Sequence, residues 1–473
     1  MIANTHTLEL GQGVSELLLD VHNALEHNDT EFAGACLIEH LYDKPNDTDG
    51  LILLARFLID GGKAPFAYPV AKQAVVQQRT WRTLMMLGAT EAVLQTPKQA
   101  IKTLNEALKA IPKSEPDIHK AMLYRLLANA YVQDFNFEKA ENWAKKSLAI
   151  ESHSQAHTAY AFSKLHKREW REGWYHYKYQ LGHADFRKKH DYGLPEWNGE
   201  QDANLMVYGE QGLGDQIAFM SACPVPPKQI NCHPKLEGLF KATFPKAEVY
   251  GKQFDPEFTE AVTSTHQTSM ATMMQWADMK PRGAYLKTVP EKEIMWKGLL
   301  DSLGEAPKIG IAWTGGVTGS DGWRTRKLDL KDLQPLLELP MNWVSLQYKD
   351  FSDEVAAFKK DTGITINEFS WGAMSQNYED TAAMVNCLDA VVCVPTTVYH
   401  LAGALGKPAF VLVHEQPHWH EGLEGDCPWW ETVEFYRRPK LTTKGAINAV
   451  TNRIKGKFSE NLHWYRSKTA SSI

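Results

Sequence analysis

The chain contains 473 residues, of which 43% are hydrophobic and 23% charged, and it carries a formal net charge of -6. This length exceeds what one hydrophobic core usually serves, so we expect about two or three domains in an ordinary globular protein. The acidic balance argues against a broad nucleic-acid-binding surface, and the six cysteines form no CxxC pair that would indicate a zinc site or a disulfide framework.

No segment of the sequence predicts secretion or membrane insertion. The opening MIANTHTLELGQG has no cationic region followed by an apolar run, and no stretch reaches the about 18 apolar residues of a membrane span. We therefore expect a cytoplasmic protein without a membrane span. No sequence feature predicts the oligomeric state.

The first third of the chain contains a repeated helical pattern. Alanines open similar segments at Ala67, Ala100 and Ala140, with Trp174 in register after them, at intervals close to the about 34 residues of a helix-turn-helix repeat. Another small residue lies twelve positions before each alanine: Ala55, Gly88 and Ala128. Small residues at both places let two antiparallel helices approach closely. The prolines of 112–116 predict an insertion at a turn.

This pattern resembles the tetratricopeptide repeat, and YRLLANAYVQDFNFEKAENWAKKSLAI (124–150) is its clearest copy. We predict such helical repeats over residues 1–180. An irregular helical bundle is the alternative, because amphipathic helices of similar length mimic one another. Stacked repeats form a concave surface that usually binds peptide or protein, so this region predicts a macromolecular partner.

The pattern changes after a linker at residues 181–203. Short apolar runs then alternate with amphipathic helices, which is typical of βαβ units in a parallel sheet. We expect strands at 205–209, 247–251, 308–314, 343–348, 390–394 and 409–413. The fold class is thus α plus α/β, with two Rossmann-like halves at 204–290 and 308–440. A connecting helix at 291–307 joins the halves, and a C-terminal helix and tail occupies 441–473.

The loop GEQGLGD follows the first predicted strand and contains one carboxylate. Gly212 and Gly214 permit a tight turn, and Asp215 lies where the helix DQIAFMSA is expected to begin. A carboxylate at that position caps the free N–H groups and repels an anion. We therefore predict a general base or a structural cap at Asp215. A phosphate-binding loop is the weaker interpretation, because GxxxxGK[ST] is absent.

A second loop, CVPTTVYHLAGALGKP (393–408), has the opposite electrostatics. Pro395 suits the start of a helix, the hydroxyls of Thr396 and Thr397 lie beside free N–H groups, and no acid follows nearby. We predict that this helix start receives a diphosphate. His400 belongs to the same set, although a buried core histidine is the alternative in this mainly apolar helix.

A glycine-rich turn with basic residues completes the predicted nucleotide-binding set. The turn TGGVTGSDG begins with Thr314, Gly315 and Gly316 and is followed by WRTRKL. Guanidinium and ammonium groups neutralise phosphate oxygens, and a solvated surface cluster is the alternative. With the two glycines of the GEQGLGD loop, the candidates from these segments and the next predicted strand are Gly212, Gly214, Thr314, Gly315, Gly316, Arg324, Arg326, Lys327 and Gln347.

Together these residues carry a family resemblance. The segments EGWYHYKYQL, LPEWNGE, YGEQGLGDQIAF, GIAWTGG, DTAAMVNCLDAVVCVPTTVYHLAGALGKPAFVLV and CPWWE are similar, in this order, to bacterial tetratricopeptide-repeat proteins with a glycosyltransferase domain. That domain is related to heptosyltransferases and, more distantly, to O-linked N-acetylglucosamine transferases of the GT-B fold. The resemblance implies inverting, metal-independent transfer from a nucleotide-diphosphate sugar, used as a co-substrate, to a protein or glycan. It also implies that Asp215 is the catalytic base and that Thr396, Thr397 and His400 lie on the diphosphate-binding helix.

The chemistry of the two loops agrees with this implication. The acceptor hydroxyl must lose a proton as it attacks the anomeric carbon, and Asp215 would accept it. The leaving diphosphate gains negative charge, which the start of the second helix and Arg326 or Lys327 would stabilise without a metal.

The sequence departs from the family pattern in two places. Pro395 replaces the aspartate of VDTSVAHL, and the first half, 204–290, is shorter than the about 100–150 residues of a typical domain. A repeat scaffold with a non-catalytic transferase-like domain is therefore the main alternative. A nucleic-acid base glycosyltransferase is a further alternative, which the negative charge disfavours.

The segment VHEQPHWHEG (413–422) raises the possibility of a metal site. It contains His414, His418, His420 and Glu421, but Pro417 interrupts a continuous helix and HExxH is not formed, so we predict no metal. We expect this loop to frame the nucleotide instead. Trp419, Trp429 and Trp430 are expected either to stack on a base or sugar or to lie in the core. Asp380, in NYEDTAAM, is expected to cap a helix.

Overall fold

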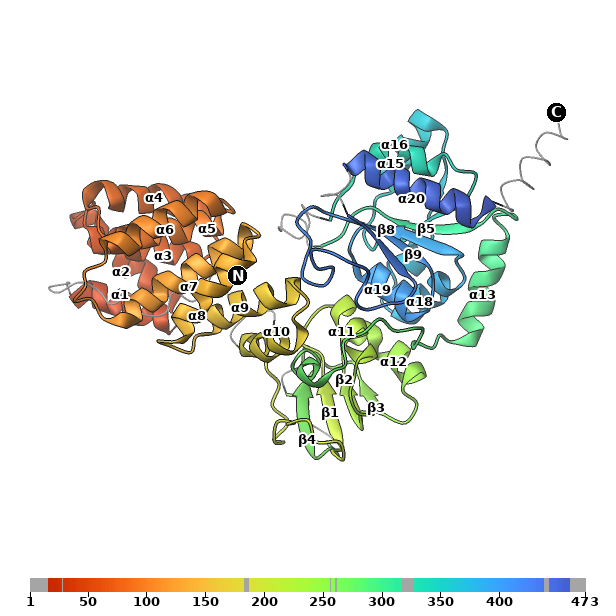
Figure 1. Cartoon of the computed structure of the whole chain (residues 1–473), viewed down its shortest axis with the longest axis horizontal. Coiled ribbons are helices and arrows are strands. Elements are labelled where there is room, and N and C mark those ends of the chain that lie inside the picture. The colour runs from red at the N-terminus through yellow and green to blue at the C-terminus, as the bar shows by residue number, and fades with distance from the viewer. Residues whose placement is uncertain are drawn as a thin grey trace. The chain divides into compact units, whose positions relative to one another are not determined.

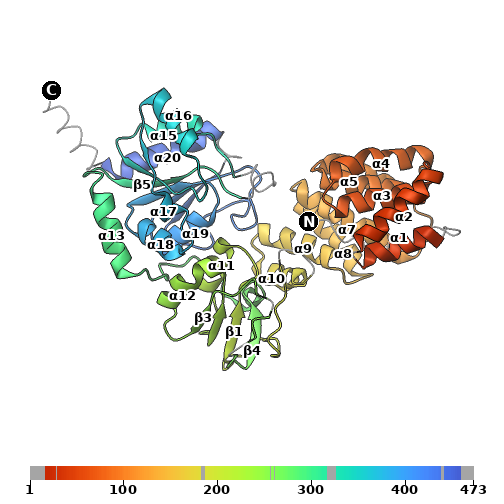
Figure 2. The same cartoon turned by 180° about the vertical axis from the view of Figure 1, so that it is seen from behind.

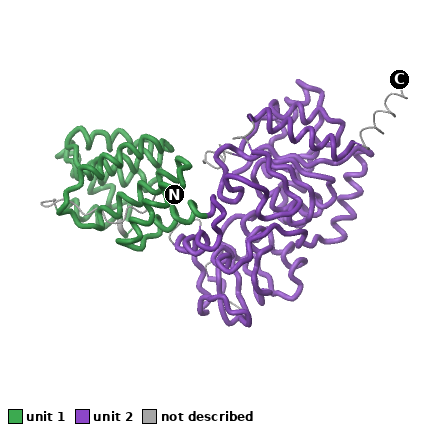
Figure 3. Tube along the Cα trace, viewed as in Figure 1, with its two compact units in different colours: residues 1–164 green, residues 165–473 purple. Residues whose placement is uncertain are grey.

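The computed structural model divides the chain into two compact units, residues 1–164 and residues 165–473 (Figures 1 and 3). The residues 165–180, which the sequence groups with the repeats, lie in the second unit. The structure describes residues 16–27, 29–182, 187–255, 257–259, 262–316, 326–437 and 442–459.

The described part of the first unit is helical. Its helices, labelled in Figure 1, are α1 (Glu16–Glu26), α2 (Thr30–Asp43), α3 (Thr48–Asp60), α4 (Ala64–Gln77), α5 (Trp81–Val93), α6 (Pro97–Ala110), α7 (Asp117–Gln133) and α8 (Phe137–Leu148). A ninth helix, α9 (Ser154–His166), runs across the division between the units. Consecutive helices pack in pairs, most extensively α5 with α6 and α7 with α8.

The small residues of the repeat pattern lie where these helix pairs touch. Ala55, Ala67, Ala100, Ala128 and Ala140 are all 0% exposed. The predicted insertion is confirmed, because α6 ends at Ala110 and α7 begins at Asp117. Alanine and glycine at these contacts let the backbones come close, which a larger side chain would prevent. The first unit is therefore a series of tetratricopeptide-like helical hairpins, as the sequence predicts.

Gly88 of α5 provides a test of this close packing. A Cβ atom added there would lie 2.6 Å from Leu104 Cγ of α6. Because overpacking a dense interior costs about 1–3 kcal/mol, Gly88→Val should lower the free energy of unfolding of the first unit by that amount. Urea denaturation of the full chain measures this change.

The matched control is Gly298→Val in α13 (Pro290–Asp301), where an added Cβ meets nothing within 4 Å. There the change should stay within about 0.5 kcal/mol, the scale of helix propensity differences. Equal losses in the two variants would contradict the close approach at Gly88.

The second unit begins with α10 (Trp170–Tyr177) and continues into a small parallel sheet. The strands are β1 (Leu205–Tyr208), β2 (Gln229–Asn231), β3 (Glu248–Tyr250) and β4 (His266–Ser269), in the order β3-β2-β1-β4. Helices α11 (Leu213–Ser221) and α12 (Glu237–Thr243) follow β1 and β2. The parallel arrangement of the first half is thereby confirmed, with β2 and β4 as strands that the sequence pattern did not predict.

After α13 the chain forms a second parallel sheet of six strands. These are β5 (Lys308–Ala312), β6 (Asn342–Ser345), β7 (Ile366–Asn367), β8 (Ala390–Cys393), β9 (Ala409–Val413) and β10 (Val433–Arg437), in the order β10-β9-β8-β5-β6-β7. The associated helices are α15 (Leu330–Leu337), α16 (Ser352–Thr362), α17 (Ser370–Ala373), α18 (Tyr378–Asn386), α19 (Thr397–Ala404) and α20 (Thr443–Lys457). Strands β7 and β10 are additional to the prediction.

Helices cover both faces of this larger sheet. Helices α15, α16 and α20 lie on one face, and α18 and α19 lie on the other (Figure 2). Ile309 and Ile311 of β5 and Phe410 of β9 pack in the cluster that contains Leu333 of α15 and Val450 of α20. Buried apolar side chains on both faces explain why these strands appear in the sequence as continuous hydrophobic runs.

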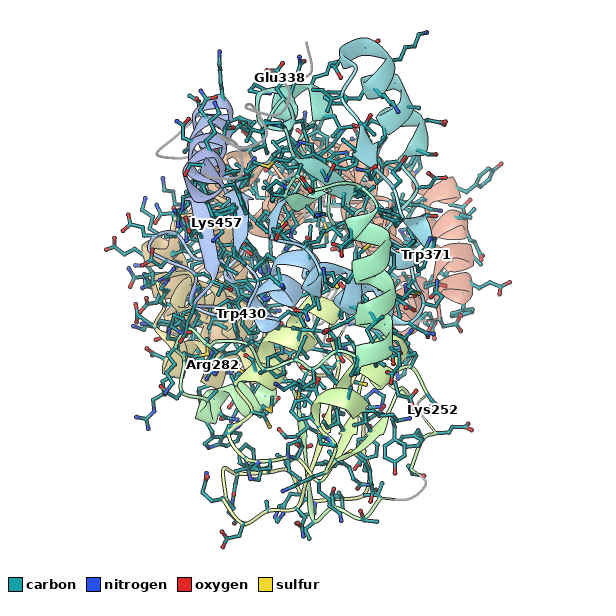
Figure 4. The ribbon with its side chains drawn as sticks, turned by 90° about the vertical axis from the view of Figure 1, so that its right-hand side faces the viewer. Lys252, Arg282, Glu338, Trp371, Trp430 and Lys457 are labelled. Carbon is teal, nitrogen blue, oxygen red and sulfur yellow. The ribbon has the colours of Figure 1, made fainter. Side chains whose placement is uncertain are left out.

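A crossing segment connects the two sheets within the second unit. Arg282 pairs with Trp430 in a parallel bridge, through hydrogen bonds from Arg282 N to Trp429 O and from Glu431 N to Arg282 O. Figure 4 labels Arg282 and Trp430, which lie side by side between the smaller and the larger sheet. Tyr285 N also donates to Ala404 O at the end of α19. These bonds fix the register between the two halves of the unit.

Candidate functional site

Three loops of the second unit meet where helices α11 and α19 begin. A Cβ atom added to Gly214 would lie 3.2 Å from Thr397 Cα, and one added to Gly315 would lie 2.3 Å from Thr396 Cγ2. Only glycine permits these approaches without displacing a neighbour. The structure thus brings together three loops that are far apart in the sequence, those that contain Asp215, Gly315 and Thr396.

Asp215 lies in the first turn of α11 but is not its first residue. The helix begins at Leu213, two residues earlier than the sequence pattern indicated. Asp215 Oδ2 accepts a hydrogen bond from Gly212 N at 3.2 Å, so the side chain does satisfy one free N–H group at the helix start. Its side chain remains 28% exposed. The capping role therefore leaves part of the carboxylate accessible.

The other oxygen of Asp215 is bonded to a histidine from the opposite sheet. His420 Nε2 lies 2.8 Å from Asp215 Oδ1, and the His420 side chain is 6% exposed. Burial raises the pKa of Asp215, but the hydrogen bond from His420, the charge of Arg326 and the Gly212 N–H together lower it by more, so the net shift is downward. The carboxyl group is thus ionised at neutral pH.

The loop that contains His420 is anchored on both sides of the residue. Trp429 Nε1 donates to His420 O at 3.1 Å, and the ring of Trp419 stacks on His420 with centroids 3.6 Å apart. Glu421 Oε1 accepts from Tyr399 OH at 3.0 Å, and Arg437 Nη2 donates to Glu421 O at 2.7 Å. These contacts hold the imidazole in one orientation.

The candidate metal ligands of this loop are engaged in other ways. His420 is bonded to Asp215, and Glu421 Oε2 accepts from the backbone N–H of His418 at 3.0 Å. Within the described ranges, no group of three or more His, Cys, Asp or Glu side chains is arranged to hold a metal ion. The described cysteines Cys36, Cys223, Cys232, Cys387, Cys393 and Cys427 are free thiols.

The start of α19 offers backbone donors without a competing acid. Thr396 is the N-cap, and its hydroxyl accepts from Val398 N at 3.2 Å. Thr397 is the first helical residue and is partly exposed, and no acidic side chain lies in the first turn. A helix start with this polarity attracts anions.

His400 faces the interior of the protein. Its Nδ1 accepts a hydrogen bond from Trp430 Nε1 at 3.1 Å, which places the ring proton on Nε2. Burial, together with the charge of Arg326, holds the pKa of His400 well below its usual range. His400 is therefore a neutral core residue, which is the alternative that its apolar helix suggested.

The turn after β5 lies next to this helix start. Thr314 Oγ1 accepts from Gln347 Nε2 at 2.7 Å, and Gly315 N donates to Arg326 O at 2.9 Å. Gln347 Oε1 is buried and has no hydrogen-bond partner among the described residues.

The other predicted residues of this turn lie as follows. Gly316 adopts a φ of 81°, a backbone conformation that favours glycine. Lys327 Nζ lies 3.4 Å from Asp329 Oδ1. Arg324 lies outside the described residues.

A cavity of about 240 Å³ lies at the carboxyl ends of β6 and β7 and includes Gln347 in its wall. Its other lining residues are Ser345, Lys349, Asp350, Phe351, Ser352, Glu368, Phe369, Ser370, Ala373 and Met374. Burial and the charge of Asp350 raise the pKa of Glu368. In parallel α/β sheets, ligands bind beyond the carboxyl ends of strands, and this cavity has that location.

The tryptophans near the site are core residues. Trp419, Trp429 and Trp430 are each at most 1% exposed, so their faces are covered by protein. The alternative of stacking on a bound base or sugar is therefore excluded for the structure as it stands. Trp371, labelled in Figure 4, differs because it is 50% exposed and stacks on the buried Trp296 with centroids 4.1 Å apart.

Two features of the site were not predicted from the sequence. The bond between Asp215 and His420 joins residues 205 positions apart, and nothing local pairs them. The α10 residues Trp174 and Tyr177 also reach the site: Trp174 packs against Trp419 with ring centroids 5.1 Å apart, and Tyr177 OH donates to Gln211 Oε1 at 3.1 Å.

A membrane-spanning helix would have to be both long and apolar, and none of the helices in the described part of the chain is.

The chain matches no family model. Among curated proteins, Protein FlbA of Caulobacter vibrioides is 24% identical over 449 residues, which cover 87% of this chain and 73% of that protein. Two solved structures align with 34% of this chain. A thermophilic tetratricopeptide-repeat protein of Thermus thermophilus is 21% identical, has a TM-score of 0.31 and is covered over 86% of its length. PilF of Pseudomonas aeruginosa is 18% identical, has a TM-score of 0.30 and is covered over 72%.

Proposed function

We propose that the second unit is an inverting, metal-independent glycosyltransferase of the GT-B type, which uses a nucleotide-diphosphate sugar. The observation that carries this proposal is the juxtaposition of an ionised, partly exposed Asp215 with the acid-free start of α19, at the contact of Gly214 with Thr397. A base and an anion-binding helix start at one place are what a single displacement at an anomeric carbon requires.

The donor would bind along the larger sheet. Its diphosphate would accept hydrogen bonds at the start of α19, near the positive charge of Arg326, which also acts on Asp215. Its nucleoside would enter the cavity at the ends of β6 and β7, where Gln347 Oε1 has no partner among the described residues. Gln347 and Thr314 connect the two regions through their hydrogen bond.

The transfer step follows from these positions. The oxygen of an acceptor hydroxyl attacks the anomeric carbon and forms the new glycosidic bond while Asp215 takes the hydroxyl proton. The bond from the anomeric carbon to the donor phosphate breaks, and its electron pair leaves with the nucleoside diphosphate. The helix dipole of α19 and Arg326 stabilise the added charge, so the step needs no metal.

The helical hairpins of the first unit are proposed to bind the acceptor. Stacked hairpins commonly bind protein segments, and a protein or a protein-linked glycan fits such a surface better than a small molecule.

A non-catalytic scaffold is the second candidate. Pro395 favours it, because this buried residue replaces a side chain that could bond to the nucleotide directly before the α19 start. In that case the site would bind a nucleotide or a protein segment without turnover.

Calorimetric titration with UDP, GDP, ADP, CMP and dTDP, first without metal and then with EDTA, tests the nucleotide site, and a sugar-transfer assay then distinguishes the transferase from a scaffold that binds without turnover. We expect micromolar binding of one nucleotide, unaffected by the chelator. Thr397→Val should weaken it by about 10- to 100-fold, the effect of losing one hydrogen bond to a charged group.

Thr443→Val is the matched control, because Thr443 is likewise the first residue of a helix, α20. It should leave nucleotide affinity unchanged. If none of the nucleotides binds, the transferase proposal fails. Equal weakening by both threonine variants would argue against a diphosphate at α19.

A further inference from the structure

The bond between His420 and Asp215 links the two sheets directly across the candidate site. Asp215 follows β1 of the small sheet, whereas His420 follows β9 of the large sheet. Resting on the proposed transfer, we propose that His420 is a positioning residue: it holds Asp215 in the orientation and charge state of a general base. Asp215 and His420 thus form a functional dyad, and the base does not act alone.

The geometry excludes His420 as the base itself. Its Nε2 is occupied by Asp215 Oδ1 at 2.8 Å, and its Nδ1 is buried and has no partner among the described residues. Neither nitrogen can therefore reach an acceptor hydroxyl. Of the two residues, only Asp215 has a substantially solvent-exposed side chain, at 28%.

The hydrogen-bond inventory also fixes the direction of the bond. A proton on Nδ1 would be a buried donor without an acceptor, which is costly, whereas a bare Nδ1 lone pair costs less. The proton therefore lies on Nε2, and Asp215 Oδ1 accepts it as a carboxylate. With Gly212 N donating to Oδ2, both oxygens are held, and the carboxylate cannot rotate.

Few of the side chains next to Asp215 and His420 change their charge near neutral pH. The titratable and charged neighbours are Tyr177 of α10, Arg326 after β5, His400 of α19, and His418 and Glu421 of the same loop. Burial raises the pKa of Tyr177 and lowers that of His400, so both stay neutral. The ring of His418 lies 5.1 Å from that of His420.

The test compares His420→Gln with His420→Phe. A glutamine amide can still donate to Asp215 Oδ1, whereas phenylalanine keeps the ring without a donor. The first readout is the pKa of the Asp215 carboxyl, measured by ¹³C NMR on protein labelled at aspartate. The Asp215 signal is assigned as the one that is lost in Asp215→Asn. We expect a higher pKa of Asp215 in His420→Phe and a return toward the wild-type value in His420→Gln.

The second readout is the pH dependence of kcat/KM for transfer. The acidic limb should move to higher pH in His420→Phe, with kcat reduced by about 10- to 100-fold for the loss of one charge-assisted hydrogen bond. His266→Phe is the control that should change neither readout, because His266 begins β4 (His266–Ser269) and bonds to Thr265 Oγ1 at 3.0 Å.

The outcomes test the dyad and the proposed transferase function independently of each other. An unchanged Asp215 titration in His420→Phe, or a His420→Gln variant no closer to wild type than His420→Phe, overturns the dyad. If the wild type transfers no sugar, the transferase proposal fails, and the carboxyl titration still decides whether His420 sets the state of Asp215.

Discussion

Asp215→Asn should reduce sugar transfer by about 10²- to 10⁴-fold, the range that general bases contribute, while nucleotide affinity stays unchanged. The amide cannot accept the acceptor proton. Donor binding is expected to depend on α19, Arg326 and the cavity at β6 and β7, none of which the substitution alters. Transfer assays with the nucleotide-sugar that calorimetry identifies, together with calorimetry on the variant, measure both quantities.

The substitution is well suited to this purpose because asparagine can replace aspartate structurally. Its side-chain carbonyl can accept one hydrogen bond, either from Gly212 N or from His420 Nε2. Asparagine is also a good residue at helix starts. We therefore expect α11 to remain folded, and circular dichroism of the variant verifies this.

Asp380→Asn is the matched control for a carboxylate with a structural role. Asp380 also lies in the first turn of a helix, α18, and its Oδ2 lies 2.8 Å from Lys292 Nζ of α13. The predicted cap at Asp380 is wrong, because Asn377 is the N-cap of α18 and Asp380 instead pairs with Lys292, which is also a structural role. Transfer by this variant should therefore stay close to wild type. Transfer that survives in Asp215→Asn would remove Asp215 as the base.

The helical repeats and the alternation of strands with helices are readable from the sequence because their signals are local. Ala55, Gly88 and Ala128 recur at fixed distances from the next small residue, and each helix pair buries its own contact. The apolar runs at β5, β8 and β9 are buried on both faces and therefore appear as continuous hydrophobic segments.

Two of the missed strands, β2 and β7, are polar or very short, and partners distant in sequence stabilise β2. Strand β2 contains Gln229 and Asn231, whose buried side chains bond to Ser264 N and to Tyr192 OH. Neither partner lies near β2 in sequence, so the segment has no strand pattern of its own. Strand β7 has only two residues, Ile366–Asn367, which is too short for any periodicity.

The site was predictable only to the level of its loops. Gly214 and Gly315 stand out because a helix start or turn follows each strand, and they do lie at the contact with Thr397 and Thr396. The partner of Asp215 was not predictable, because His420 comes from another sheet and its loop was expected to frame the nucleotide. Side-chain pairing across a fold depends on packing that no local pattern encodes.

Arg187 and Glu210 form a buried ion pair next to the Asp215 loop. Both side chains are 0% exposed, with Arg187 Nη2 3.2 Å from Glu210 Oε1. Arg187 Nη1 also donates to Tyr177 O at 2.8 Å, and Glu210 Oε1 accepts from Ala271 N at 3.2 Å. The pair thus joins α10, the end of β1 and the end of β4. Its loss should loosen the loop that begins at Glu210.

Arg187→Met should lower the free energy of unfolding of the second unit by about 3–5 kcal/mol at neutral pH, because a buried carboxylate loses its cation. Burial already raises the pKa of Glu210, against the opposing charge of Arg187, and the variant raises it further. A carboxyl group whose pKa is higher in the folded than in the unfolded protein contributes stability at low pH, where it is protonated. That contribution is lost as the pH rises through the pKa of the folded state. The deficit should therefore be smaller at about pH 5.5 than at about pH 8.

Urea denaturation at both pH values, with hydrogen exchange of residues 205–221 to localise the change, measures this deficit. Adding Glu210→Gln to Arg187→Met should restore most of the stability at high pH, because the neutral amide still accepts from Ala271 N. Arg453→Met breaks an exposed pair with Glu434 and should cost less than about 1 kcal/mol. A deficit that is equal at both pH values, or that Glu210→Gln fails to reduce, would show that the ionised Glu210 is not what destabilises the variant.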